Sequence, residues 1–183
     1  MWPMKARPVT LLIGLLALLL APNEVLSGPP IWSKETVRVL DYTTAKWDGM
    51  VAGMVDEFNV MLPDTAPDLV YRRMAERSCE DLGNRTFVGA IVVCSVPTAT
   101  FVGMTGIWTG RSTMLDTRIL LNDRRFLNER FATNTVCHEL MHAVTGIRDN
   151  YDRRPKSSCV WGNLPTPGRF DAAYARKVYS DQR

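Results

Sequence analysis

The chain has 183 residues, of which 46% are hydrophobic, 9% aromatic and 22% charged, and its formal net charge is +3. This apolar content excludes an intrinsically disordered chain, and the length suits one compact domain. The 22 basic and 19 acidic residues are spread along the sequence without a basic cluster. We therefore expect no nucleic-acid partner.

The amino-terminal segment has the pattern of a secretory signal peptide. Lys5 and Arg7 precede an apolar stretch over residues 9–21, which is shorter than the roughly 20 residues that cross a bilayer. Small side chains near the end of the segment suit a signal peptidase site. We predict a signal peptide over residues 1–27 and a secreted mature domain over residues 28–183, with no membrane attachment after cleavage. An uncleaved membrane anchor is the alternative.

Beyond this segment, the hydrophobic pattern alternates between strand and helix periodicity. Strands are expected over residues 36–41, 69–72, 89–96, 101–108 and 117–121. Helices are expected over residues 46–62, 133–144 and 172–179. The apolar stripe of the first helix indicates core packing, and Gly146 suits the left-handed position that ends the second helix. This order of elements predicts an α+β fold.

If the chain is exported, its four cysteines are expected to form disulfides. An even number favours disulfides over free thiols in an oxidising compartment, and the C-x-x-C spacing of many zinc sites is absent. Four cysteines allow three pairings. Of these we favour the sequential one, Cys79–Cys94 and Cys137–Cys159, in which each bond would contribute on the order of 3 kcal/mol by closing its loop.

Residues 138–142 read His-Glu-Leu-Met-His, and these are the two histidines of the chain. Histidines at i and i+4 on a helix project from the same face, so both imidazoles can bind one metal ion. Zinc lowers the pKa of a bound water to about 7, and Glu139 is placed to take the proton of that water. The motif predicts a zinc peptidase with His138 and His142 as ligands and Glu139 as general base.

A catalytic zinc site needs a third protein ligand and an open position. Since no histidine remains, this ligand must be a carboxylate, a tyrosine or a thiolate. Gly146 allows the chain to turn back toward the metal after the helix, which makes Asp149 the best placed candidate. Asp152 is the second candidate and Glu129 the third.

With these residues the sequence resembles the metzincin metallopeptidases, in particular the small secreted matrixin-like proteins of bacteria and fungi. The resemblance rests on His138-Glu-x-x-His142 followed by Gly146-x-x-Asp149, and it covers residues 89–179. Further matching segments are residues 91–94, 107–108, 119–123, 136–137, 158–159, 170–171 and 178–179.

The resemblance implies a zincin-like single domain and a zinc-dependent endopeptidase. The implied fold has a twisted mixed sheet, a long amino-terminal helix, an active-site helix and two disulfides. The implied partner is a peptide or protein substrate, and we expect a monomer. In this family the substrate binds as an extra strand along the sheet edge above the zinc. The segment that matches this edge strand comprises Arg118, Ile119, Leu120, Leu121 and Asn122.

Three positions depart from the family pattern. Thr145 stands where the family has glycine, and Gly146 follows one residue later. Asp149 replaces the usual third histidine, and Val160 stands in place of the methionine of the Met-turn. We expect the valine to supply an apolar floor beneath the imidazoles, with reduced metal affinity.

These departures motivate a second hypothesis, in which a catalytically impaired zincin-fold protein acts as a secreted binding module. The retained Glu139 argues against it. In a third hypothesis zinc serves folding alone. The sequence offers no fourth strong ligand near the motif, which a closed structural site would need.

Overall fold

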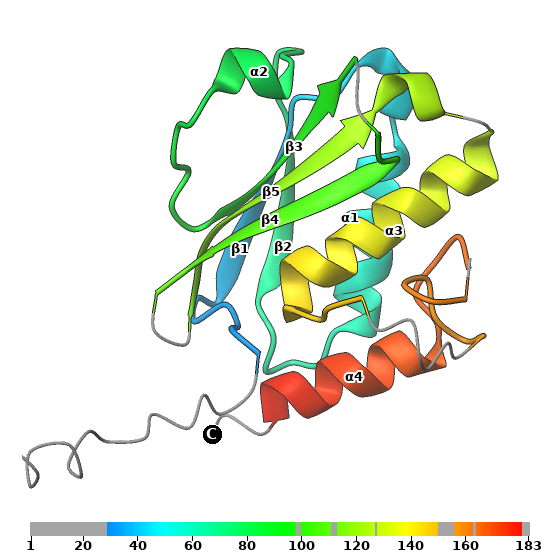
Figure 1. Ribbon diagram of the computed structural model, residues 1–183. Helices are drawn as coiled ribbons and strands as arrows, with labels where there is room; N and C mark the ends of the chain where they lie inside the picture. The colour runs from blue at the N-terminus through cyan, green and yellow to red at the C-terminus, as the bar shows by residue number, and fades with distance from the viewer. Residues whose placement is uncertain are drawn as a thin grey trace, which may run out of the picture.

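The computed structural model describes residues 29–97, 100–110, 113–126, 128–149, 156–162 and 164–180. Within these ranges the protein has an α+β fold, with one mixed sheet of five strands and four α-helices (Figure 1). The predicted signal peptide, residues 1–27, lies outside the described residues. Among the helices of the described part, none combines the length and apolar character that a membrane span requires.

The strands predicted from periodicity are all present. Their bounds are Thr36–Asp41 for β1, Asp68–Arg73 for β2, Ala90–Val96 for β3, Gly103–Thr109 for β4 and Met114–Asn122 for β5. They lie in the order β2-β1-β3-β5-β4. Strand β1 pairs in parallel with both β2 and β3, and β3 pairs in parallel with β5. Strand β4 pairs with β5 in the antiparallel sense. One edge of the sheet is therefore formed by β4.

The segment expected at the sheet edge lies inside the sheet. On β5, Ile119 pairs with Val93 of β3 on one side and with Thr105 of β4 on the other. The backbone groups of this strand are thus used within the sheet. The prediction of a free edge was wrong for Arg118, Ile119, Leu120, Leu121 and Asn122. The physical reason is hydrophobicity, because the apolar run 119–121 suits a strand buried on both faces.

The described part of the chain has four α-helices in addition to the sheet. Their bounds are Met50–Met61 for α1, Cys79–Leu82 for α2, Glu129–Thr145 for α3 and Arg169–Ser180 for α4. The helix expected over residues 46–62 begins only at Met50, because Gly49 has a left-handed φ of 74° and separates it from a short helical turn at Ala45–Trp47. The short α2 was not predicted. It begins with a capping box between Ser78 and Asp81.

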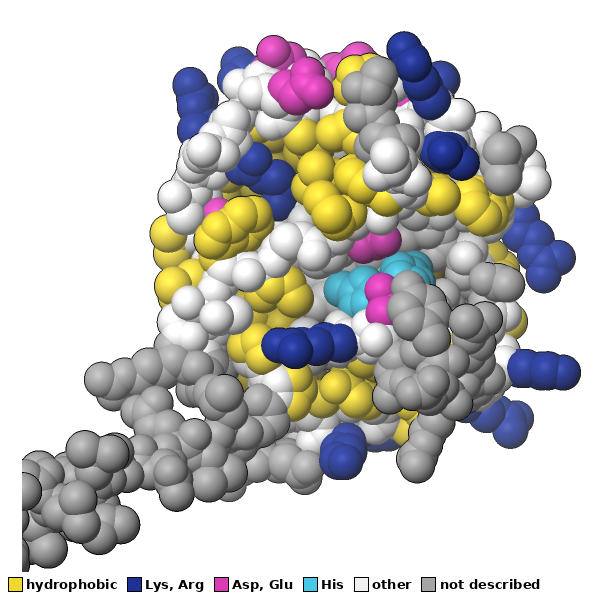
Figure 2. Space-filling view, in the orientation of Figure 1, with side chains coloured by type: hydrophobic (Ala, Val, Ile, Leu, Met, Phe, Trp, Pro, Cys, Tyr) yellow, Lys and Arg dark blue, Asp and Glu magenta, His cyan; other side chains and the backbone are white. Residues whose placement is uncertain are grey.

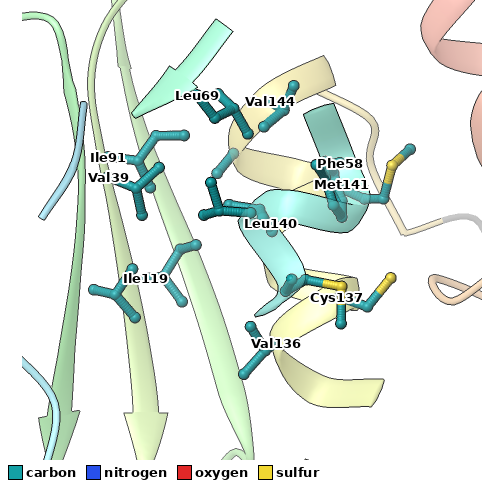
Figure 3. Packing of buried hydrophobic residues seen from close by; sticks show 14 of the residues in the cluster. Val39, Phe58, Leu69, Ile91, Ile119, Val136, Cys137, Leu140, Met141 and Val144 are labelled. Carbon is teal, nitrogen blue, oxygen red and sulfur yellow. The ribbon is translucent and has the colours of Figure 1, made fainter. Parts of the chain in front are cut away.

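The main core lies between the sheet and the helices α1 and α3. Figure 3 shows Val136, Leu140 and Val144 of α3 on the side that faces the sheet. They pack in one cluster with Val39, Ile91 and Ile119 of the strands and with Phe58 of α1. Burial of each such side chain contributes roughly 1.5–3 kcal/mol. This packing fixes α3 against the sheet and leaves another face of the helix for the site.

The two disulfides join Cys79 to Cys94 and Cys137 to Cys159. This is the sequential pairing that the sequence favoured. The first bond ties α2 to β3 on the face of the sheet opposite α3, where a smaller apolar cluster lies. The second ties α3 to the turn at Cys159. Two such bonds fit a protein that folds in an oxidising compartment.

Candidate metal centre

The helix α3 brings the two histidines together. It begins after Asn128, whose side chain accepts a backbone N–H of the first turn at 2.9 Å, and ends at Gly146, which has a left-handed φ of 65°. Because its apolar face is committed to the core, His138 and His142 project from another face, one turn apart. Their Nε2 atoms lie 3.0 Å from each other.

Asp149 completes a group of three donors. After Gly146 the chain turns back, and Asp149 Oδ1 lies 3.4 Å from His138 Nε2 and 3.5 Å from His142 Nε2. Three ligands of a tetrahedral ion with bonds of about 2.0–2.1 Å would be separated by about 3.3 Å. Within the described residues, this group could hold a metal ion. The separations between its donor atoms fit such an ion.

Of the other two carboxylates considered as third ligands, Glu129 does not enter this group. Glu129 is the first residue of α3. It lies nine positions before His138, which is about 13 Å along a helix axis. Asp152 lies outside the described residues.

Both imidazoles are oriented by backbone carbonyl groups. His138 Nδ1 lies 3.0 Å from the Val160 carbonyl oxygen, and His142 Nδ1 lies 2.6 Å from the Ile147 carbonyl oxygen. A carbonyl oxygen can only accept, so each Nδ1 carries the proton and donates it. Each Nε2 then presents a lone pair toward the other donors, which is the arrangement found in histidines that bind metals. Two lone pairs this close repel each other, and a cation between them would remove the repulsion.

The turn that carries Val160 is itself anchored at two points. The disulfide from Cys159 reaches Cys137, the residue directly before the histidine motif. The Asp171 carboxylate of α4 is fully buried and accepts hydrogen bonds from the Ser158 hydroxyl at 2.6 Å and from the Cys159 N–H at 2.9 Å. The Val160 side chain packs in the main core. These contacts fix the carbonyl that orients the first histidine.

Glu139 lies beside the donor group without belonging to it. Its side chain is buried, with Oε1 at 4.0 Å from His138 Nε2. The Thr105 hydroxyl of β4 donates to its Oε2 at 2.6 Å. Burial raises the pKa of the Glu139 carboxyl above its usual value, and the Thr105 hydrogen bond and the two histidines oppose that rise.

The site opens to the surface between α3 and β4. Figure 2 shows the two histidine side chains in a hollow, with acidic side chains above and below them. The strand comes close to the helix because position 103 is a glycine. A Cβ atom there would lie only 2.7 Å from Glu139 Cγ and 2.8 Å from Thr135 Cγ2. Gly103 thus allows the edge strand to approach the carboxylate.

Thr105 and the orienting carbonyls were not predicted from the sequence. Alternation along a strand places Thr105 on the same face as Gly103 and Ile107, but the alternation does not say which face meets α3. Thr105 and Glu139 are 34 positions apart in the chain. Backbone carbonyls have no side-chain signature, so the partners of the two Nδ1 atoms could not be read from the sequence.

Comparison with known proteins assigns no family to the chain. The sequence matches none of the known family models, and no curated protein shows significant similarity to it. The functional interpretation therefore depends on the motif and on the geometry described above.

Proposed function

We propose that the protein is a secreted, metzincin-type zinc endopeptidase in which Glu139 is the general base. The observation that carries the proposal is the buried Glu139 carboxylate beside the three donors of His138, His142 and Asp149. A closed structural zinc site has four protein ligands. In the described part of the chain only three gather here, which would leave a position for water or substrate.

When bound, zinc supplies a Lewis acid that lowers the pKa of water to about 7 and polarises a carbonyl group. Glu139 would accept a proton from the attacking water and deliver it to the leaving amine. The Thr105 hydroxyl holds Oε2 of this carboxylate, so Oε1 is the oxygen turned toward His138. Burial raises the pKa of Glu139 above its usual value, and a general base works better as its pKa comes closer to the working pH.

The substrate would bind along β4 instead of β5. In the sheet order, β4 has a partner strand on one side only. An extended peptide can add to such an edge through backbone hydrogen bonds. Thr105 lies on this strand and contacts Glu139, so a peptide paired with Gly103–Thr109 would pass beside the donor group. The substrate-binding role expected for Arg118–Asn122 is thereby reassigned.

The departures at Thr145 and Val160 do not weaken the case for an enzyme. The Val160 carbonyl oxygen still accepts from His138 Nδ1. Gly146 still takes the left-handed conformation that turns the chain toward Asp149. The contacts that orient the donors are therefore made without the family's glycine and methionine.

The test combines metal content with hydrolysis by the mature chain, residues 28–183. The purified zinc-loaded protein should hydrolyse denatured casein, lose this activity with a chelator and regain it with zinc. Glu139→Gln should keep the zinc and lose about 10²–10⁴-fold in rate, because a neutral amide cannot accept the proton. Equal inertness of wild type and Glu139→Gln at full zinc occupancy would contradict the proposal and favour the binding module.

A further inference from the structure

The carboxyl-terminal end of α3 is held by one aromatic side chain from each end of the described chain. Trp32 Nε1 donates to the Ala143 carbonyl oxygen at 2.9 Å, and the Tyr179 hydroxyl donates to the Val144 carbonyl oxygen at 2.7 Å. The Trp32 main chain also hydrogen-bonds the Tyr179 hydroxyl. In Figure 1 the blue start of the described chain and the red end of α4 lie together near this end of α3.

These hydrogen bonds satisfy backbone groups that the helix leaves without partners. The last four carbonyls of an α-helix have no intrahelical donor. The Gly146 N–H reaches the His142 carbonyl oxygen at 3.0 Å, but the carbonyls of Ala143 and Val144 depend on the two aromatics. Both residues are fully buried, so water cannot replace a lost donor.

The loop that follows this end of α3 contributes two groups to the metal site. The Ile147 carbonyl oxygen accepts from His142 Nδ1, and Asp149 follows two residues later. The segment before Trp32 also touches this point. A Cβ atom on Gly146 would lie 2.8 Å from the Pro30 carbonyl oxygen. The start of the described chain thus packs where the loop of residues 146–149 leaves the helix.

We propose that Trp32 and Tyr179 are positioning residues for the metal group. They fix the last turn of α3, and through it the loop 146–149, which supplies both the carbonyl that orients His142 and the carboxylate of Asp149. Neither aromatic touches the donor atoms themselves. The inference rests on the metal binding in the proposed function but does not depend on peptidase activity.

The test removes each donor while leaving an aromatic side chain at the position. Trp32→Phe and Tyr179→Phe are compared with Trp47→Phe and Tyr71→Phe. The control side chains donate to Asp123 Oδ1 at 2.7 Å and to Asp41 Oδ2 at 2.9 Å, and neither partner is in α3 or in its following loop. Zinc affinity is measured by competition with a chromophoric chelator, and the stability of each metal-free variant by thermal unfolding.

Trp32→Phe and Tyr179→Phe should each weaken zinc binding by about tenfold. This is the lower end of the loss in affinity that follows when a residue supporting a metal ligand is removed. The two controls should stay within about twofold of wild type at a similar loss of stability. The proposal is overturned if all four variants lose zinc affinity in proportion to their stability, or if Trp32→Phe and Tyr179→Phe bind as wild type does. If Trp32→Phe does not fold, the comparison of Tyr179→Phe with Tyr71→Phe decides.

Because the readout is zinc affinity, the two proposals fail in different ways. A wild-type chain that binds zinc but hydrolyses nothing contradicts the proposed function alone. A chain that binds zinc and hydrolyses peptides, with unchanged zinc affinity in Trp32→Phe and Tyr179→Phe, contradicts this inference alone. A wild-type chain that binds no zinc contradicts both.

Discussion

Thr105 Oγ1 lies 2.6 Å from Glu139 Oε2 and 3.0 Å from the Glu139 carbonyl oxygen. One hydroxyl on the edge strand therefore contacts both the side chain and the backbone of the proposed general base. A single hydroxyl proton can serve only one strong hydrogen bond at a time, and the shorter contact is to the carboxylate. The relationship couples the strand along which a peptide would bind to the residue that would move the proton.

Replacing this hydroxyl should impair catalysis without affecting the metal. Thr105→Val keeps the shape but cannot donate, and we expect about a tenfold lower kcat with unchanged zinc content. In the wild type, the hydrogen bond from the Thr105 hydroxyl lowers the pKa of Glu139. Its removal should therefore move the acidic limb of the pH–rate profile to higher pH. Steady-state kinetics across pH provide the measurement, and Thr105→Ser should restore the wild-type profile. An unshifted profile in Thr105→Val would show that the hydroxyl does not tune the base.

Loss of the third donor should act on the metal first. Asp149→Ala removes the carboxylate 3.4 Å from His138 Nε2. Zinc affinity should fall by more than the roughly 10–100-fold that loss of an outer-shell partner costs, and hydrolysis should fall with it. This differs from Glu139→Gln, in which the metal stays.

Glu129→Ala is the matched control for Asp149→Ala. It deletes a carboxylate at the other end of α3 and should bind zinc as the wild type does. Both affinities follow from chelator competition. If Asp149→Ala retained full zinc affinity and full rate, the third ligand would have to be sought elsewhere, with Asp152 next in line.

Gly103 should be intolerant of any side chain for a steric reason. The methyl group of Gly103→Ala would meet Glu139 Cγ and Oε1 at 2.7 Å. A displacement of the base by a fraction of an ångström should reduce hydrolysis by up to about 100-fold, with zinc binding preserved. Casein hydrolysis and metal content report the two effects separately.

A second glycine on the same strand provides the control. In Gly106→Ala the new methyl group would lie 3.2 Å from the Trp108 ring, which is half-exposed and free to shift outward. This variant should keep most of the activity. If the two variants lost activity equally, a general disturbance of β4 would explain both, and close packing against Glu139 would not.

Local patterns predicted the five strands and the three longer helices of this fold, but not which of these elements lie beside one another. The strands and α3 follow from periodicity, since alternation and 3.6-residue spacing are properties of short windows. The late start of α1 follows from the conformation of Gly49, which the apolar stripe does not reveal. Both β4 and β5 have the local pattern of a strand. Which of them lies at the sheet edge depends on pairing between distant residues, so the local pattern does not predict the edge position of β4.

The candidate site likewise contains residues that the sequence predicted and one that it did not. His138, Glu139 and His142 are adjacent in sequence on one helix, so their proximity is fixed by helical geometry. Asp149 could be proposed because only a glycine-led turn separates it from that helix. Thr105 could not, because its contact with Glu139 arises from the packing of β4 on α3.

The two disulfides should differ in their effect on the metal. The double variant Cys137→Ala/Cys159→Ala removes the bond that anchors the turn before Val160, whose carbonyl oxygen orients His138. We expect zinc affinity to fall by at least tenfold, as for loss of other outer-shell support. The free energy of unfolding should also fall, by on the order of 3 kcal/mol. Chelator competition and denaturant unfolding of the metal-free chain measure the two quantities.

Cys79→Ala/Cys94→Ala is the matched control, because it removes a loop-closing bond on the opposite face of the sheet. Its sequence separation is 15, compared with 22 for the other bond, so the entropic contributions to stability are similar. This variant should therefore lose comparable stability while its zinc affinity stays near that of the wild type. Equal losses of zinc affinity in both double variants would mean that the metal group responds to global stability, and the turn at Val160 would have no specific part in holding His138.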